Sequence, residues 1–330
     1  RRSLLPGQQE EGTVFGKPLV ADMISRSAEN PADRRNFLRA AGLAGLGAVG
    51  AVTAMTVGAQ DALAADAPIS DGAILNFALN LEYLEAEYYL RATTGQGLPD
   101  SLTTGTKALG GVTGGSQVPF KAGSTVAKYA REIAADELAH VKFLRGALGS
   151  AAVARPKINF TDAFNAAATA AGVIKAGESF DPFKDETSFL LGAFIFEDLG
   201  VTAYKGGAPL ISNKDYLGAA AGILAVEAYH AGLVRRSLYN LGVDVAVITN
   251  KISDARDSLD GRSDDDQGVL AGNPRAYRAN LVPADKDAIA YSRSPQQVHN
   301  IAYLTASSGV TKGGFFPDGT NNDDARLTTT

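Results

Sequence analysis

The sequence contains no cysteine, and this absence removes several kinds of site at once. Disulfides, thiolate-bound metals, iron–sulfur clusters and cysteine nucleophiles are all excluded. An excess of positive charge is also lacking, because 31 Lys and Arg stand against 36 Asp and Glu, for a formal net charge of −5. Nucleic-acid binding depends on a strongly basic face that releases counterions, so we do not expect nucleic acid as a partner.

Residues 1–64 have the features of an export signal. Arg34 and Arg35 precede an apolar stretch at 40–59, and a small-x-small sequence follows at 62–64. The segment resembles a twin-arginine signal, which implies export to the periplasm or cell envelope. The alternative is a retained membrane anchor, since the stretch is nearly long enough to span, although its glycines make it a poor anchor. A membrane is expected as a partner only in that second case.

Four later stretches carry apolar residues at the spacing of a helix rather than of a strand. They predict helices over about 70–91, 124–148, 186–204 and 214–240. The long connection between the second and third helices can run the length of a bundle, whereas the short loop before the fourth makes its neighbours antiparallel. The predicted fold class is therefore all-α, a four-helix bundle over residues 65–242 with a long crossover between helices two and three.

Two further segments lack this pattern. The Gly- and Thr-rich excursion at 93–123 is longer than a bundle needs, so we expect a surface lid or a contact between subunits of a homo-oligomer. Residues 243–330 lose the helical pattern and are rich in turn residues, with short helices expected only near 253–259 and 296–304. We interpret them as an irregular C-terminal extension packed on the bundle, because they carry too little apolar pattern for a core of their own.

Two of the three histidines each follow a glutamate by three residues, as Glu137 with His140 and Glu227 with His230. Positions i and i+3 share one helix face, so each Glu-x-x-His pair presents a carboxylate and an imidazole to the same point. Each pair is thus half of a metal site. The third histidine, His299, has no such partner and is expected to be structural or exposed.

The other two helices mirror each other in the same way. Glu82 is followed seven residues later by Tyr89, and Glu197 by Tyr204, which makes the chain two similar helix pairs. This repeat predicts a pseudo-two-fold axis that brings the two half-sites face to face. The tyrosines are either hydrogen-bond donors to the ligands, redox relays, or packing residues. Glu85, one turn from Glu82 on the same face, is its rival, and the mirrored spacing favours Glu82.

Charge balance points to metal at this site. Glu197 and Glu227 lie in strongly apolar stretches, where an uncompensated carboxylate costs roughly several kcal/mol. Two divalent ions would offset the charge of the four converging carboxylates. A donor set of carboxylates and imidazoles favours iron or manganese.

The complete pattern resembles the ferritin-like superfamily, in which two helices give one Glu each and two give Glu-x-x-His. The stretches at 80–89 and 313–317 further resemble the ferritin-like proteins related to plant desiccation-response proteins, over about residue 68 to the C-terminus. This resemblance implies two bound Fe or Mn ions, with Glu137 and Glu227 as bridges. The ligands that it implies are Glu82, Glu137, His140, Glu197, Glu227 and His230.

Two functions fit these features. The first is redox chemistry on a small oxidant, peroxide or dioxygen, of the catalase or ferroxidase kind and in the service of stress protection. The second is a non-catalytic stress or desiccation protein that uses its metal for stability or self-assembly. Iron storage in a closed shell is less expected, because the excursion and the C-terminal extension would obstruct the shell.

Several charged residues near the helices are expected to be ordinary surface groups. Glu87 and Glu132 fall off the inward faces of their helices and should be solvated. Arg145 and Arg235 lie near helix C-termini. They could neutralise carboxylates near the end of the bundle, but the simpler interpretation is that they are exposed arginines that complement the helix dipole.

Overall fold

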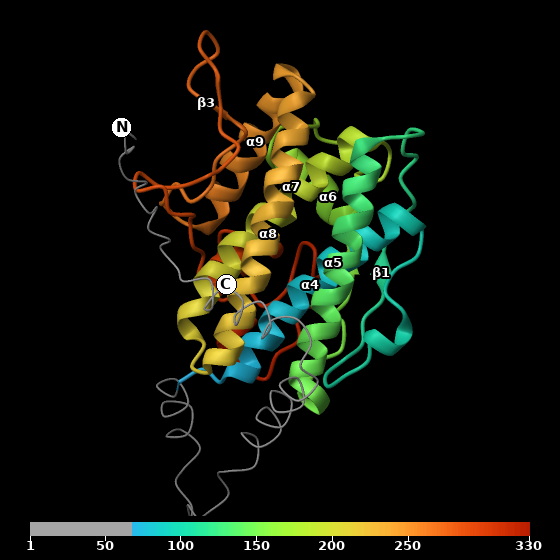
Figure 1. Cartoon of the computed structure of the whole chain (residues 1–330), viewed down its shortest axis with the longest axis vertical. Helices are drawn as coiled ribbons and strands as arrows, with labels where there is room; N and C mark the ends of the chain where they lie inside the picture. Colours follow the sequence, from blue (N-terminus) through green and yellow to red (C-terminus); the bar gives the residue numbers. More distant parts are fainter. Residues whose placement is uncertain (1–67) are drawn as a thin grey trace, which may run out of the picture. The chain divides into compact units, whose positions relative to one another are not determined.

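The computed structural model describes residues 68–330, so the predicted twin-arginine signal lies outside the described residues. Four long helices lie side by side in it and confirm the predicted all-α bundle (Figure 1). Each helix lies within a few residues of its predicted range. They are α4 (Asp71–Thr94), α5 (Thr125–Leu148), α7 (Glu186–Gly207) and α8 (Lys214–Asn240).

Polar residues at the N-terminus of each bundle helix determine where it begins. Ser70 and Ser124 each accept a hydrogen bond of 3.2 Å from a backbone amide of the first turn, and Asp185 accepts one of 2.8 Å. Asn213 does the same for α8. These side chains satisfy amides that have no partner within the helix. At the other end of α4, Gly95 takes the left-handed conformation with φ of 75°, which glycine adopts without strain.

Shorter elements fill the connections. The excursion after α4 contains β1 (Val112–Thr113), which pairs in parallel with β2 (Ile158–Asn159) of the crossover, just before α6 (Phe160–Ala170). Residues 68–330 also contain four single turns of 3₁₀ helix, η1 (Asp100–Leu102), η2 (Gly149–Ala151), η3 (Ala208–Leu210) and η4 (Ala325–Leu327).

The C-terminal extension is more regular than its sequence suggested. It begins with the long α9 (Val243–Asp260), directly after a turn at Gly242 with φ of 97°, and later forms α10 (Pro295–Ala302). Between them β3 (Leu270–Ala271) pairs with β4 (Arg278–Ala279) in an antiparallel hairpin. The helical period of α9 is hidden because many of its positions are polar.

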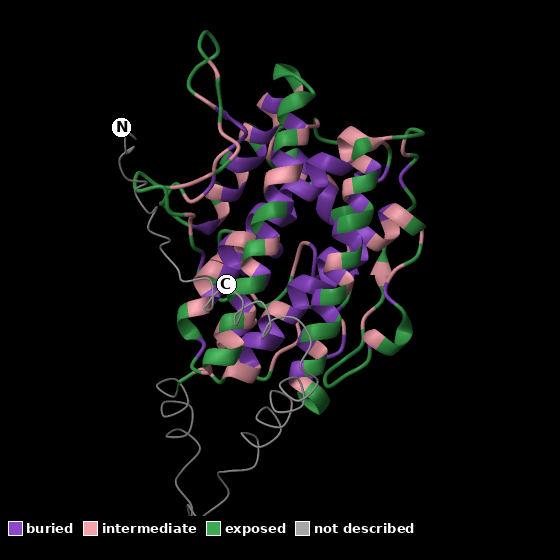
Figure 2. Ribbon diagram, in the orientation of Figure 1, coloured by how far each residue is buried: buried purple, intermediate pink, exposed green. Residues whose placement is uncertain are grey.

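The extension contacts the outer side of α7. Residues 189–200 of this helix are all buried. Figure 2 shows the buried residues, in purple, along the surfaces where the helices pack together. A helix that is apolar all round needs neighbours on every side. For α7 these are α4 and α8 on the bundle side, and α9 and α10 on the other. The unbroken apolar run of α7 is therefore explained by the extension.

Aromatic side chains fill the space between α4, α7 and the crossover. Tyr88 contacts the rings of Phe160, Phe189 and Phe196 at centroid distances of 5.8, 5.4 and 5.2 Å. Its hydroxyl donates a hydrogen bond of 2.7 Å to the backbone carbonyl of Phe189. This buried hydroxyl is thus satisfied, and the cluster fixes α6 and α7 against α4.

Buried ion pairs attach the extension to the bundle. Asp198 of α7 accepts hydrogen bonds from Arg235 of α8 (2.7 Å) and Arg256 of α9 (3.1 Å). The expectation that Arg235 is exposed is wrong, because its exposed fraction is 0%. Its guanidinium also donates to backbone carbonyls of the extension, at Gln267 and Gly268. The extension covers the C-terminal part of α8, which the helix dipole argument could not foresee.

Arg293 extends this network on the side of α10. It is fully buried, and it contacts Asp260 at 2.6 Å, Asp266 at 3.1 Å and the hydroxyl of Thr202 at 3.0 Å. Together the network contains three arginines and three aspartates, so its formal charges balance. Removing any one of them would leave one buried charge in the network uncompensated.

Glu87 also differs from its sequence-based interpretation. It is fully buried, and it pairs with Arg91 of the same helix and with Arg155 of the crossover. It also accepts a backbone hydrogen bond from Leu98. Glu87 thus fixes the excursion against α4, whereas Glu132 is exposed as predicted. Arg145 is partly exposed and donates to the hydroxyl of Tyr83.

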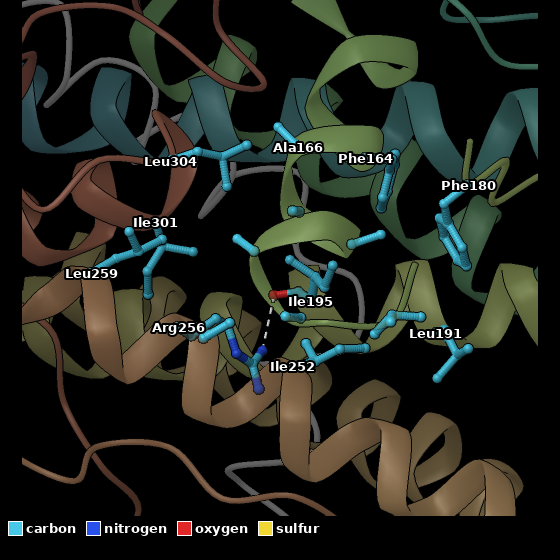
Figure 3. Close-up of a pocket in the computed structure, with 16 residues that line it drawn as sticks. Phe164, Ala166, Phe180, Leu191, Ile195, Ile252, Arg256, Leu259, Ile301 and Leu304 are labelled. Atoms are coloured by element: carbon cyan, nitrogen blue, oxygen red, sulfur yellow. Dashed lines mark hydrogen bonds between the residues drawn. The ribbon is translucent and has the colours of Figure 1, made fainter. Parts of the chain in front are cut away.

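An apolar cavity of about 120 Å³ lies between α6, α7, α9 and α10 (Figure 3). Its walls include Phe164, Leu191, Ile252 and Ile301, and Arg256 is its one polar lining residue. The guanidinium of that arginine donates to backbone carbonyls of α7, as the dashed line in Figure 3 shows for one of them. None of the predicted metal ligands lines this cavity.

Within residues 68–330, α8 is long and apolar enough to cross a membrane by length and composition alone. A core helix of a bundle passes the same test, so the finding is weak evidence for a membrane span.

We expect Arg293→Met to lower the free energy of unfolding by about 3–5 kcal/mol, because Asp260 would keep a buried charge without a cation and Asp266 would keep only its pair with Arg256. Chemical denaturation of the two proteins measures this difference. Lys286→Met is the matched control, since Lys286 is a cation of the same extension with an 86% exposed side chain. The control should change stability by no more than about 0.5 kcal/mol. Equal stability of the two variants would contradict a structural role for the network.

Candidate metal centre

The structure brings all six predicted ligands together in the interior of the bundle. Each of the four bundle helices contributes, and every one of the six side chains is buried, with His140 the most exposed at 8%. The residues are Glu82 from α4, Glu137 and His140 from α5, Glu197 from α7, and Glu227 and His230 from α8. The two Glu-x-x-His pairs therefore face each other across the bundle, as the repeat predicted.

Their donor atoms form two overlapping groups. Within each group the atoms lie within 4.8 Å of one another, which is close enough to hold one metal ion. Glu137 belongs to both groups, as a bridging carboxylate would. Glu227 belongs to one, so its predicted bridging role stays a prediction. The groups are Glu82, Glu137, His140 and Glu227, and Glu137, Glu197 and His230.

Both imidazoles point Nδ1 into the cluster. Nδ1 of His140 lies 3.2 Å from Oε2 of Glu82, 3.4 Å from Oε2 of Glu137 and 3.5 Å from Oε1 of Glu227. Nδ1 of His230 lies 3.1 Å from Oε1 of Glu137. Each histidine thus presents the same ring nitrogen that a metal would bind, surrounded by carboxylate oxygens.

The inward-facing atoms of the cluster lack hydrogen-bond partners. Each of the six residues has at least one fully buried donor or acceptor atom without one, and both oxygens of Glu137 and of Glu227 are in this state. Such an atom costs about 1–3 kcal/mol unless something satisfies it. Two divalent cations would satisfy all of these atoms at once. The residues therefore fit a dimetal site, and their oxygen and imidazole donors suit iron or manganese.

Each of the two tyrosines donates a hydrogen bond to the ligand glutamate of the other helix. Tyr204 of α7 donates its hydroxyl to Oε1 of Glu82 on α4, and Tyr89 of α4 donates to Oε1 of Glu197 on α7. In both glutamates Oε2 is the oxygen left without a partner. Each tyrosine thereby fixes one carboxylate with its second oxygen free for a metal. Of the interpretations of the sequence, the structure favours hydrogen-bond donors to the ligands.

The pKa values of the cluster residues in the metal-free protein differ strongly from their ordinary values. Burial alone would lower the pKa of His140, but Glu82 and Glu137 beside it raise that pKa to about 11. Burial likewise works against the charged form of His230, yet Glu197 and Glu137 raise its pKa to about 12. Burial raises the pKa of Glu82 to about 7 and that of Glu227 well above its ordinary value. Without metal, the cluster therefore retains protons at neutral pH in place of cations.

Glu85, the rival of Glu82, lies beside the cluster and outside both groups. It is buried, and burial together with the neighbouring carboxylates, Glu227 first, raises its pKa well above the ordinary value. Opposite it, a side chain at Gly200 of α7 would collide with the carboxylate of Glu227 and would lie 3.3 Å from Oε1 of Glu85. A glycine at this position leaves room for both carboxylates.

Sequence reasoning missed one residue at this site. Asp136 of α5 lies with Oδ2 3.1 Å from Nε2 of His230, on the far side of the ring from the cluster. Its position directly before Glu137 is the signal that could have identified it, because that position lies at the edge of the inward face.

The fold and the cluster define a class, that of four-helix bundles with a buried carboxylate and histidine site for two metal ions. The family profile described as a ferritin-like domain matches residues 70–240, and the chain belongs to this ferritin-like family.

Two characterised proteins are similar over most of the chain. The desiccation-related protein PCC13-62 of Craterostigma plantagineum is 28% identical over 248 residues, which cover 70% of this chain and 77% of that protein. The ferritin-like catalase Nec2 of Nesocodon mauritianus is 27% identical over 275 residues, covering 78% and 85%. No solved structure matches the chain significantly.

We expect the metal-free protein to lose stability as pH rises from about 5 to 8. The folded pKa of Glu82 is raised from 4.5 to about 7, and that of His140 from 6.5 to about 11, so the folded state binds protons that the unfolded chain has released. Burial alone would raise the pKa of Glu137, but His140 and His230 lower it to about 2. The stability that Glu137 contributes is therefore fully present at pH values above its unfolded pKa of 4.5. Its contribution is constant in this range.

The metal-loaded protein should show the opposite slope, because protons compete with metal for the same oxygens. Thermal melting at several pH values, with and without Mn(II) or Fe(II), measures both slopes. Parallel curves for the two forms would mean that these side chains do not share one buried metal site.

Proposed function

We propose that this chain is an exported ferritin-like protein that disproportionates hydrogen peroxide with two bound iron or manganese ions. The observation that carries the proposal is the set of buried, unpartnered ligand atoms that converge from four helices. Similarity to a protein named as a ferritin-like catalase supports the choice of peroxide among small oxidants.

The enclosure of the cluster supports a very small substrate. The side chain of His140 is 10% exposed and that of His230 4%, while the four carboxylates are almost fully covered. Only a molecule of a few atoms can approach such a site. Two molecules of hydrogen peroxide give two of water and one of dioxygen, so the reaction needs no further reductant.

The paired ions would exchange electrons with peroxide, and the protein would supply geometry and protons. Tyr89 and Tyr204 hold Glu197 and Glu82 with one oxygen each facing inward. The apolar bundle excludes bulk water from the reacting molecules. Glu85 is buried beside Glu227, and burial raises its pKa well above the ordinary value, so it is placed to give a proton to the hydroxide that leaves as water and to receive one from the next peroxide.

A second function is favoured by the other relative. The similarity to a desiccation-related protein supports a non-catalytic role in stress, in which bound metal only stabilises the bundle. Oxidation of ferrous iron by dioxygen at the same cluster is the alternative redox reaction. Activity measurements on one preparation separate the three.

We expect the protein, reconstituted with Mn(II) or Fe(II), to release dioxygen from hydrogen peroxide faster than it oxidises ferrous iron. Glu85→Gln should keep two bound ions and lower kcat by roughly 100-fold or more, as loss of a general acid does. Glu132→Gln, which alters an exposed glutamate of α5, should leave both properties unchanged. An oxygen electrode and elemental analysis provide the two measurements.

If protein that holds two ions shows neither peroxide disproportionation nor oxidation of ferrous iron, the redox proposal is excluded and the stress role remains. Loss of metal from Glu85→Gln would make Glu85 a ligand rather than a proton carrier.

Export is the remaining part of the proposal, and it is supported by Arg34, Arg35 and the small-x-small sequence at 62–64. We expect mass spectrometry of protein isolated from the cell envelope to find an N-terminus near Ala65. A dominant species that retains Arg34 and sediments with membranes would favour the anchor instead.

A further inference from the structure

The two histidines of the cluster differ on the side of the ring that faces away from it. Nε2 of His230 lies 3.1 Å from Oδ2 of Asp136, while Nδ1 of the same ring faces the carboxylates. In the part of the chain that the structure describes, Nε2 of His140 has no carboxylate partner. One imidazole is therefore fixed from behind by a charged acceptor and the other is not.

The internal repeat shows why. Asp136 precedes Glu137 in α5 and reaches across to His230 of α8. The residue at the corresponding position in α8, directly before Glu227, is Val226. An aliphatic side chain cannot accept a hydrogen bond from an imidazole N–H. The two halves of the repeat therefore differ at the position directly before the glutamate of each Glu-x-x-His pair.

No competing partner accounts for Asp136. Its side chain is 44% exposed, and within residues 68–330 it forms no ion pair with lysine or arginine. An exposed aspartate gains little from holding a fixed geometry. Its contact with His230 is therefore the interaction that defines its position.

We propose that Asp136 is a positioning residue that strengthens metal binding at one of the two positions only, the one formed by Glu137, Glu197 and His230. This inference rests on the proposed dimetal function. An imidazole that binds metal through Nδ1 carries its proton on Nε2. A carboxylate that accepts this proton in a hydrogen bond fixes the ring and makes Nδ1 a stronger donor to the metal.

The consequence is that the two metal positions respond differently to the same change. Loss of a hydrogen-bond partner behind a ligating histidine typically lowers metal affinity about 10–100-fold. Here that loss can affect only the position that contains His230. The position formed by Glu82, Glu137, Glu227 and His140 should keep its affinity.

The test is a titration of the metal-free chain with Mn(II), in which electron paramagnetic resonance measures the free ion and yields two dissociation constants. Asp136→Ala should weaken one of them roughly 10–100-fold and leave the other unchanged. Asp136→Glu, which restores a carboxylate, should recover most of the loss. Glu132→Ala removes an exposed carboxylate from the same helix and should change neither constant.

Double variants assign the effect to one position. In a His230→Ala background, Asp136→Ala should have no further effect, whereas in a His140→Ala background it should keep its full effect. Val226→Asp, which places a carboxylate at the corresponding position of the repeat, should strengthen the other constant. Circular dichroism of each variant checks that the bundle is intact.

Equal weakening of both constants, or the full effect of Asp136→Ala in the His230→Ala background, would overturn the inference and leave the dimetal function standing. No uptake of Mn(II) or Fe(II) by the unaltered chain would overturn both.

Discussion

Convergence of buried carboxylates in an apolar bundle is the constraint on which the rest of the structure depends. Like charges at this spacing repel strongly where water is excluded, so they need cations or protons between them. The features around the cluster all serve that need. His140 and His230 lie between the carboxylates, and Tyr89 and Tyr204 each satisfy one outer oxygen. What remains is a set of inward-facing atoms that two metal ions would satisfy together.

The internal repeat explains both the symmetry of the site and its exceptions. Positions that face the centre are the same in both halves, because both metal positions need the same donors. Positions one step further out differ, as Asp136 differs from Val226 and Glu85 from Gly200. With metal bound, these exceptions would give the two halves different surroundings. Under the proposed function, a symmetric ligand set would thus hold two ions that differ in binding strength and in proton supply.

Sequence alone could predict the bundle and the convergence of the six ligands, because both follow from spacing within single helices. Glu-x-x-His on one face and the matched Glu and Tyr spacing need no knowledge of the tertiary structure. Contacts between elements could not be predicted in this way. Glu87 was interpreted as solvated because its position in the helix faces away from the bundle. Helical periodicity does not show that the excursion covers this position. Arg235 was misjudged for the same reason.

The structure also separates two kinds of buried charge on two different faces of one helix. Glu197 of α7 faces the metal cluster, while the next residue, Asp198, faces the arginines of the extension. The network on the extension side contains equal numbers of positive and negative groups, so its attachment to α7 requires no metal. The cluster on the bundle side has four carboxylates and two imidazoles, and its balance depends on bound ions or protons. Loss of metal should therefore loosen the bundle interior first, while the extension stays attached to α7 and holds the helix in place for ions to bind again.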